Sequence, residues 1–90
     1  MRLDKYLFCI RLLKSRTLAQ GLIEEGRTRI DGRRVEKCSD AVRVGSTITL
    51  PLRGAVRVIR VLSLPDRRRP APEARAAYEE LGVDDGTGAA

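Results

Sequence analysis

Residues 14–35, KSRTLAQGLIEEGRTRIDGRRV, contain the pattern that decides the fold. They predict a short amphipathic helix that begins at a hydroxyl residue between two cations and ends at Gly26. A tight hairpin should follow at once, because Asp31-Gly32 between short alternating runs is typical of a type I′ turn. The stretch therefore places a helix N-terminus, which favours anions, beside an arginine-rich β-ribbon.

Ser15 is the favoured N-cap of this helix, with Thr17 as the alternative because Gln20 follows it three residues later. Either cap leaves backbone N–H groups facing outward next to Lys14 and Arg16. Apolar residues at helical spacing should pack on the preceding helix: Leu18, Ala19, Leu22 and Ile23.

A two-residue hairpin loop would place Arg29 directly opposite Arg34. The residues expected on the inward side are Thr28, Ile30 and Val35. Those expected on the outside are Arg27, Arg29 and Arg34. Two opposed arginines are mildly destabilising in a free hairpin, and either an anion lying across them or splaying into water would relieve that cost.

The first helix is predicted over residues 2–13, where helical spacing gathers one apolar face: Leu3, Tyr6, Leu7, Ile10 and Leu13. The opposite face contains Asp4, Lys5, Phe8 and Arg11. Asp4 is interpreted as a helix N-terminal charge or an arginine partner rather than a catalyst. Phe8 has two readings, a half-buried residue against a neighbouring loop or a stacking surface for a base or ribose.

Two strands are predicted beyond the hairpin, over residues 47–52 and 55–64, with a bulge near Val58-Ile59. From Pro65 the sequence predicts an extended linker that carries an arginine cluster at residues 67–69. A last helix should begin at Pro72, with its apolar stripe formed by Ala74, Ala77, Tyr78 and Leu81. The expected division is therefore a domain at 1–64, a linker and short helix at 65–81, and a disordered tail at 82–90.

The charge distribution points to a polyanionic partner. The net charge is +6, yet residues 1–69 hold 17 basic and 7 acidic side chains, whereas residues 70–90 hold 1 and 5. A cationic field of this kind favours nucleic acid over an anionic membrane surface or a charge that serves only solubility. No long apolar run or export signal occurs in these 90 residues, so we expect a cytoplasmic protein with no membrane partner.

The sequence contains few of the residue patterns that catalytic or metal sites require. The chain has no histidine, no glycine-rich phosphate loop followed by lysine, and no carboxylate pair in an apolar run. Cys9 and Cys38 stand far apart, and Cys9 is interpreted as a core residue rather than a disulfide partner. We therefore expect a monomeric binding protein with no catalytic residue, no metal, no cofactor and no small-molecule substrate.

The order of elements narrows the class of binding fold. A helix-turn-helix reader normally adds a third helix before any hairpin. A ribonucleoprotein-type sheet needs aromatic residues on its strands, and a KH module needs a G-x-x-G loop; this sequence has neither feature.

Four motifs together resemble a known family: R-L-D-K-Y-L at 2–7, K-S-R-T-L-A-Q at 14–20, E-E-G-R-T-R-I-D-G at 24–32 and V-R-V-G-S-T-I at 42–48. The sequence is similar to the S4-type RNA-binding domain, or alpha-L motif, over about residues 2–62. The resemblance implies an α+β fold with two N-terminal helices packed on a small, mostly antiparallel sheet, plus a short C-terminal helix. It also implies an RNA-binding surface on Arg2, Lys5, Arg11, Lys14, Ser15, Arg16, Gln20, Arg27, Arg29 and Arg34.

A narrower similarity concerns the R-L-D-K opening and R-R-P-A-P-E-A-R-A-A-Y-E-E at 68–80. Both resemble the small bacterial heat-shock members of this family, which recycle stalled large ribosomal subunits. That similarity implies binding to ribosomal RNA, or to transfer RNA on the large subunit, in rescue of stalled subunits. The alternatives are a ribosome-assembly or structural ribosomal RNA-binding protein, and a general cationic binder of DNA or other anions.

Overall fold

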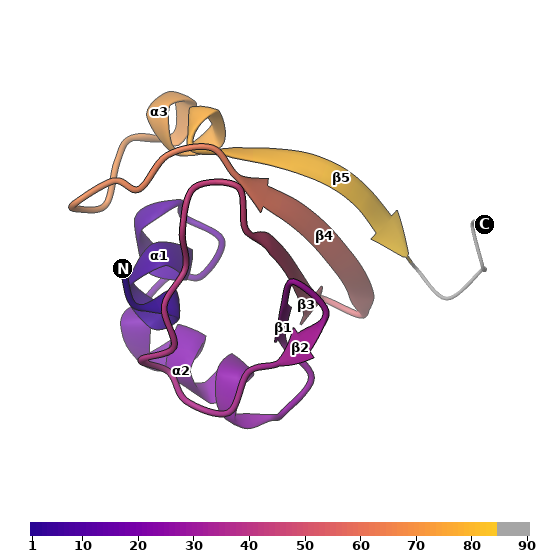
Figure 1. Cartoon of the computed structure of the whole chain (residues 1–90). Helices are drawn as coiled ribbons and strands as arrows, with labels where there is room; N and C mark the ends of the chain where they lie inside the picture. Colours follow the sequence, from indigo (N-terminus) through magenta and orange to yellow (C-terminus); the bar gives the residue numbers. More distant parts are fainter. Residues whose placement is uncertain (85–90) are drawn as a thin grey trace.

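Two helices pack against one face of a five-stranded antiparallel sheet whose order is β2-β1-β3-β4-β5 (Figure 1). The computed structural model describes residues 1–84 of the chain. The elements in chain order are α1 (Leu3–Cys9), α2 (Arg16–Glu24), β1 (Arg29–Ile30), β2 (Arg33–Arg34), β3 (Thr47–Leu52), β4 (Ala55–Val61), α3 (Ala71–Ala76) and β5 (Tyr78–Asp84).

Helix α1 is shorter than the sequence predicted, because it ends at Cys9 instead of continuing to residue 13. Ile10 caps it, and Arg11 then takes a left-handed backbone conformation with φ of 63°. The chain must leave the helix axis here to start α2 only a few residues later. Leu13, predicted to lie in the core, is half-buried and packs against its edge.

Helix α2 begins as predicted from Ser15, whose Oγ accepts a hydrogen bond from the Leu18 N–H at 3.1 Å. It ends before Gly26, where φ is 83° and a side chain would be strained. Ala19 and Ile23 are buried against the rest of the core. The prediction for Leu18 was wrong, because its position on the helix turns 53% of its surface to solvent.

The hairpin formed by β1 and β2 has the predicted register, with Arg29 opposite Arg34 and Ile30 opposite Arg33. Asp31 and Gly32 both have positive φ, as a type I′ turn requires. The predicted inward residues are indeed buried: Thr28, Ile30 and Val35. Strand β1 then pairs with β3, so the hairpin continues the main sheet.

Strands β3 and β4 form the centre of the sheet. Strand β3 has the predicted bounds, whereas β4 ends at Val61 instead of reaching residue 64. The predicted bulge is present, because the pairing of β4 with β5 shifts register between Val58 and Ile59.

The C-terminal region differs most from the prediction. Helix α3 spans only Ala71–Ala76, and residues expected to continue it form β5, which pairs antiparallel with β4. Of the expected helical stripe, Ala74 and Ala77 are buried while Leu81 is 40% exposed. Residues 82–84, expected to begin a disordered tail, are the end of β5; the remainder of that expected tail lies outside the described residues.

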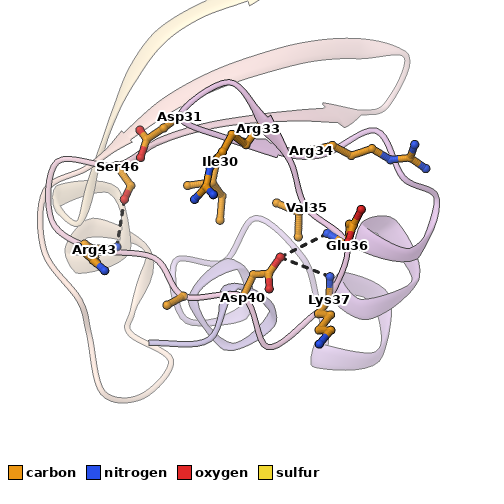
Figure 2. A pocket seen from close by; sticks show the side chains of 11 residues that line it. Ile30, Asp31, Arg33, Arg34, Val35, Glu36, Lys37, Asp40, Arg43 and Ser46 are labelled. Atoms are coloured by element: carbon orange, nitrogen blue, oxygen red, sulfur yellow. Dashed lines mark hydrogen bonds between the residues drawn. The ribbon is translucent and has the colours of Figure 1, made fainter.

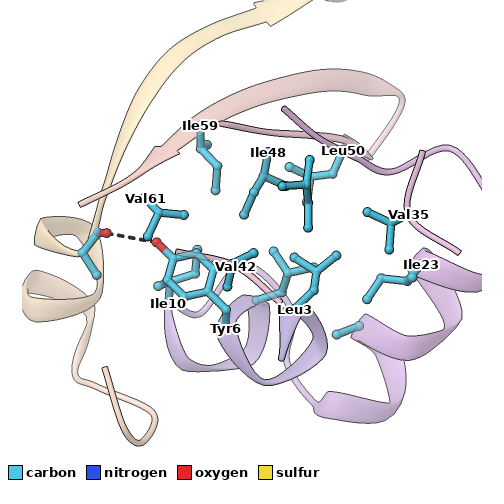
Figure 3. Packing of buried hydrophobic residues seen from close by; sticks show 14 residues of the cluster. Leu3, Tyr6, Ile10, Ile23, Val35, Val42, Ile48, Leu50, Ile59 and Val61 are labelled. Carbon is cyan, nitrogen blue, oxygen red and sulfur yellow. Dashed lines mark hydrogen bonds between the residues drawn. The ribbon is translucent and has the colours of Figure 1, made fainter. Parts of the chain in front are cut away.

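A single apolar cluster joins the helices to the sheet (Figure 3). Helix α1 and its C-cap contribute Leu3, Tyr6, Leu7 and Ile10. In Figure 3 Leu3, Tyr6 and Ile10 lie opposite the sheet residues Ile48, Leu50, Ile59 and Val61. The Tyr6 hydroxyl donates a hydrogen bond to the Ala77 carbonyl at 3.0 Å, which ties α1 to the residue between α3 and β5. Burial, with a smaller contribution from nearby Tyr78, raises the pKa of the Tyr6 phenol far above its ordinary value.

Candidate nucleic-acid interface

A fully buried carboxylate, Asp4 in the first turn of α1, gathers polar side chains from both N-terminal helices. Arg2 donates to both of its oxygens, Nε to Oδ1 and Nη2 to Oδ2, each at 3.1 Å. Gln20 of α2 donates from Nε2 to Oδ2 at 2.9 Å, and Arg16 Nη2 lies 3.4 Å from each oxygen. We call Arg2, Asp4, Arg16 and Gln20 the corner cluster.

The hydrogen bonds of the corner cluster keep its carboxylate ionised. Burial is the largest single influence on the pKa of Asp4 and acts to raise it. Hydrogen bonds from Gln20, Arg2 and the Lys5 backbone N–H, together with the charge of Arg16, outweigh burial and hold the pKa below its ordinary value. Asp4 is therefore charged near neutral pH and fixes the two arginines.

The two arginines of the corner cluster still present charge to solvent. Their side chains are 50% exposed for Arg2 and 43% exposed for Arg16, although the carboxylate that they share is inaccessible. The N-terminus of α2 lies beside them, with Ser15 satisfying one of its free N–H groups. This corner can approach a phosphate with orientated donors whose positions are already fixed.

The arginines predicted on the outside of the hairpin are exposed, and we call Arg27, Arg29 and Arg34 the hairpin arginines. Their contacts are local: Arg27 pairs with Glu25 at 2.9 Å, and Arg29 donates to the Gly32 carbonyl at 3.2 Å. The guanidinium of Arg34 lies over Gly26, where an added Cβ would come within 2.7 Å of its Nη2. None of these contacts reaches a buried charge.

The other predicted site residues lie around α1 and its end. Lys5 is half-buried on α1, and Lys14 is exposed in the turn before α2. Arg11 follows the end of α1 and donates to the Arg69 carbonyl at 3.3 Å. The structure thus brings Arg2, Arg16 and Gln20 into direct contact through Asp4, while the hairpin arginines form a separate group.

Asp4 is the residue that sequence reasoning did not place in the site. The predicted pairing of Asp4 with arginine is confirmed, but Asp4 was assigned to the polar face of α1, whereas it is buried between the helices. Its place in the first turn of a helix two residues after Arg2 is compatible with pairing, but α2 supplies the partners that bury it. That tertiary contact has no signature in the local sequence.

A polar groove of about 700 Å³ runs beside the hairpin (Figure 2). Its lining includes Arg33, Lys37 and Arg43, none of which was predicted, and also three acidic residues. Two of these acids hold the backbone, since Asp40 accepts from the Glu36 and Lys37 N–H groups and Asp31 accepts from the Thr47 N–H. With Arg34, the lining carries four basic and three acidic side chains, so much of its positive charge is offset.

Other kinds of site find no support within residues 1–84. No helix there is long and apolar enough to cross a bilayer. The same residues contain no group of three or more histidine, cysteine or carboxylate side chains that could hold a metal ion. Cys9 is buried and Cys38 is half-buried, and both are free thiols.

Comparison with protein families identifies the fold. The family model described as "S4 domain" matches residues 1–48, which is more than half of the chain. The chain belongs to the S4 domain family. The match contains the corner cluster and the hairpin arginines, so both lie in the part of this S4 domain protein that defines the family.

Curated relatives extend the match beyond the S4 domain. The chain is 40% identical over 80 residues to heat shock protein 15 of Escherichia coli, covering 89% of this chain and 59% of that protein. It is 38% identical over 66 residues to the RQC P-site tRNA stabilizing factor of Bacillus subtilis, covering 73% and 76% of the two chains. The chain thus spans about 60% of the length of the heat shock protein 15 relatives that it matches.

A solved structure of a relative confirms the predicted α+β S4 fold. Heat shock protein 15 of Vibrio cholerae, solved as a trimeric structure, superposes with a TM-score of 0.84 at 36% identity. The superposition covers 91% of this S4 domain protein and 82% of that chain.

Proposed function

We propose that this S4 domain protein binds RNA on the large ribosomal subunit, either ribosomal RNA or transfer RNA held there, and acts in the rescue of stalled subunits. The corner cluster carries the proposal. It holds two half-exposed arginines and a glutamine in fixed positions on a buried carboxylate, beside a capped helix N-terminus. Such an array suits phosphate groups on a shaped RNA surface rather than a small molecule in a closed cavity.

The relatives support the choice of RNA and of the large subunit. One relative is named for stabilising transfer RNA at the ribosomal P site, and others are named heat shock protein 15. These names, with the S4 domain match, favour ribosome rescue over binding of general anions or DNA.

The proposed role is non-catalytic, and its place is the cytoplasm, where large subunits are found. The corner cluster contains one carboxylate and no nucleophile or histidine, so its chemistry is positioning. We propose that the protein acts as a monomer. The Vibrio cholerae relative was solved as a trimeric structure, so the alternative to a monomer is a trimer. Sedimentation velocity distinguishes the two by their mass.

Cosedimentation tests the proposed target. The tagged protein is centrifuged at physiological salt with free large subunits, small subunits or intact ribosomes. We expect recovery with free large subunits, and stronger recovery when they carry transfer RNA. Equal recovery with small subunits would contradict a specific large-subunit role, and release by matched B-form DNA as efficiently as by structured RNA would favour a general cationic binder.

A further inference from the structure

The arginine-rich linker between β4 and α3 docks on the end of α1. The Arg69 N–H donates to the Cys9 carbonyl at 3.3 Å, and Arg11 donates in return to the Arg69 carbonyl at 3.3 Å. Figure 1 shows this segment passing on the side of the molecule where α1 lies. The linker therefore has a defined position at the end of the helix that carries Asp4.

Arg68 of this linker is held against an aromatic ring. Its guanidinium carbon lies 4.9 Å from the centroid of the Phe8 ring, a cation–π contact. Its Nε is buried and has no hydrogen-bond partner within residues 1–84. The side chain as a whole is only half-buried, so its terminal N–H groups, rather than the enclosed Nε, are the donors that a ligand can reach. Stacking on a ring leaves the in-plane N–H groups of a guanidinium free to donate.

The linker and the corner cluster both contact α1, the linker at its end and the corner cluster at Asp4 in its first turn. Burial, with a smaller contribution from Asp66, raises the pKa of the Cys9 thiol, and the charges of Lys5, Arg16 and Arg69 oppose that rise. Cys9 thus lies within electrostatic range of both the corner cluster and the linker. In the linker the one described acid, Asp66, is already paired with Arg69 at 3.1 Å, so Arg67 and Arg68 add unopposed positive charge.

We propose that Phe8 and Arg68 form a phosphate-binding site that extends the RNA face from the corner cluster onto the linker. The ligand is a phosphate of an RNA backbone, which accepts hydrogen bonds from the guanidinium that Phe8 holds in place, while Arg67 strengthens the local field. Arg68 lies outside residues 1–48, the part of the chain that matches the S4 domain model. The inference rests on the proposed function, because it assumes an RNA ligand.

The test is RNA affinity as a function of salt for Arg68→Ala, Phe8→Leu and the double variant. Arg68→Ala should weaken binding by about fivefold and reduce the log–log salt slope by about one unit. Phe8→Leu should weaken binding less, because the Arg68 guanidinium remains but no longer has an aromatic ring to hold it in position. In the Arg68→Ala background Phe8→Leu should have no further effect, since the ring acts through the guanidinium.

The matched control is Arg60→Ala, which removes the same charge from an exposed position of β4 next to buried Ile59 and Val61. Its affinity and slope should stay close to those of the parent. Thermal melting checks that each variant is folded, and Arg68→Lys, which keeps the charge without the planar fork, should recover only part of the affinity.

The outcomes separate this site from the proposed function. If the parent binds RNA and Arg16→Ala weakens it, but Arg68→Ala matches Arg60→Ala, the Phe8–Arg68 site is refuted and the proposed function stands. Additive effects of Phe8→Leu and Arg68→Ala would also refute it. Failure of the parent to bind any RNA refutes both. Saturable binding of inorganic phosphate at micromolar concentration, lost in Arg68→Ala, would assign the site to a free anion and overturn the RNA backbone as its ligand.

Discussion

The corner cluster and the hairpin arginines carry the same type of charge but are built differently. In the corner cluster, Arg2 and Arg16 converge on a carboxylate that is fully buried, and Gln20 completes its hydrogen bonds. In the hairpin, the backbone is fixed by pairing with β3, but the arginine side chains contact only nearby exposed groups.

This difference determines how binding is coupled to folding. Removing a member of the corner cluster should disturb both the RNA surface and the packing of α1 on α2, since the same contacts serve both. Removing a hairpin arginine should affect binding alone, because stability in that region comes from Ile30, Val35 and the strand pairing. The predictions below test this separation.

The largest effect is expected from Asp4→Ala. It leaves two arginines and Gln20 without their shared acceptor and opens a gap between the helices, so unfolding free energy should fall by about 3 kcal/mol. Urea unfolding measures it. Asp66→Ala is the control, since that carboxylate also pairs with an arginine but its side chain is 81% exposed, and it should cost less than about 0.5 kcal/mol. Equal costs would show that the corner cluster is no more fixed than a surface pair.

Ile30→Ala should cause the next largest loss of unfolding free energy, about 2–3 kcal/mol, because Ile30 is only 7% exposed and anchors the hairpin to the core. Binding should be lost only as the domain unfolds. Leu18→Ala provides the comparison, since this side chain is 53% exposed and should cost well under about 1 kcal/mol. A cost for Leu18→Ala similar to that for Ile30→Ala would contradict the exposure of that leucine.

Acid should destabilise the corner cluster selectively. The pKa of Asp4 is lowered in the folded state, so its contribution to stability is fully present above the ordinary value of 3.8 and is lost as pH falls through the lower folded value. Urea midpoints of the parent and Asp4→Asn, measured from about pH 6 to about pH 2, isolate this contribution. The gap between the two proteins should narrow as pH falls; a constant gap would mean that the charge of Asp4 does not stabilise the fold.

Local chemistry made the central part of this fold predictable. Ser15 before the second helix, Gly26 after it and Asp31-Gly32 in the hairpin each need a special backbone or cap, and each is where the sequence placed it. The surface positions of the hairpin arginines then follow from strand alternation. For the second helix and the hairpin, the sequence was sufficient to predict the fold.

The predictions from the sequence were wrong where tertiary contacts determine the local structure. Spacing alone could not show that α1 ends at Cys9, where Arg11 soon takes a left-handed conformation, or that Asp4 is buried against Arg16 and Gln20 of α2. Helical spacing placed Tyr78 and Leu81 in the last helix, and residues from 82 onward were expected to be disordered, yet Tyr78–Asp84 pair with β4. A strand partner about 20 residues away in the sequence overrides that weak local preference.

The smallest stability effects come from the arginines themselves, and they test the comparison most directly. Arg16→Ala removes one of several donors to the buried carboxylate and should cost about 1 kcal/mol of stability, since Arg2 and Gln20 remain. Arg29→Ala removes an exposed side chain and should cost less than about 0.5 kcal/mol. Urea unfolding compares the two.

Arg16→Ala and Arg29→Ala should lose similar amounts of RNA affinity, although they differ in the unfolding free energy that they lose. If each arginine meets a phosphate, both changes should weaken binding across unrelated RNA sequences and reduce the salt slope by about one unit. Arg16→Lys keeps the charge but not the planar guanidinium, so it should keep more of the salt slope than Arg16→Ala while losing part of the affinity. If both alanine variants stay folded and bind with the parent's slope, neither region contacts RNA. If only Arg16→Ala loses binding, the hairpin arginines lie outside the interface, and the corner cluster alone recognises phosphate.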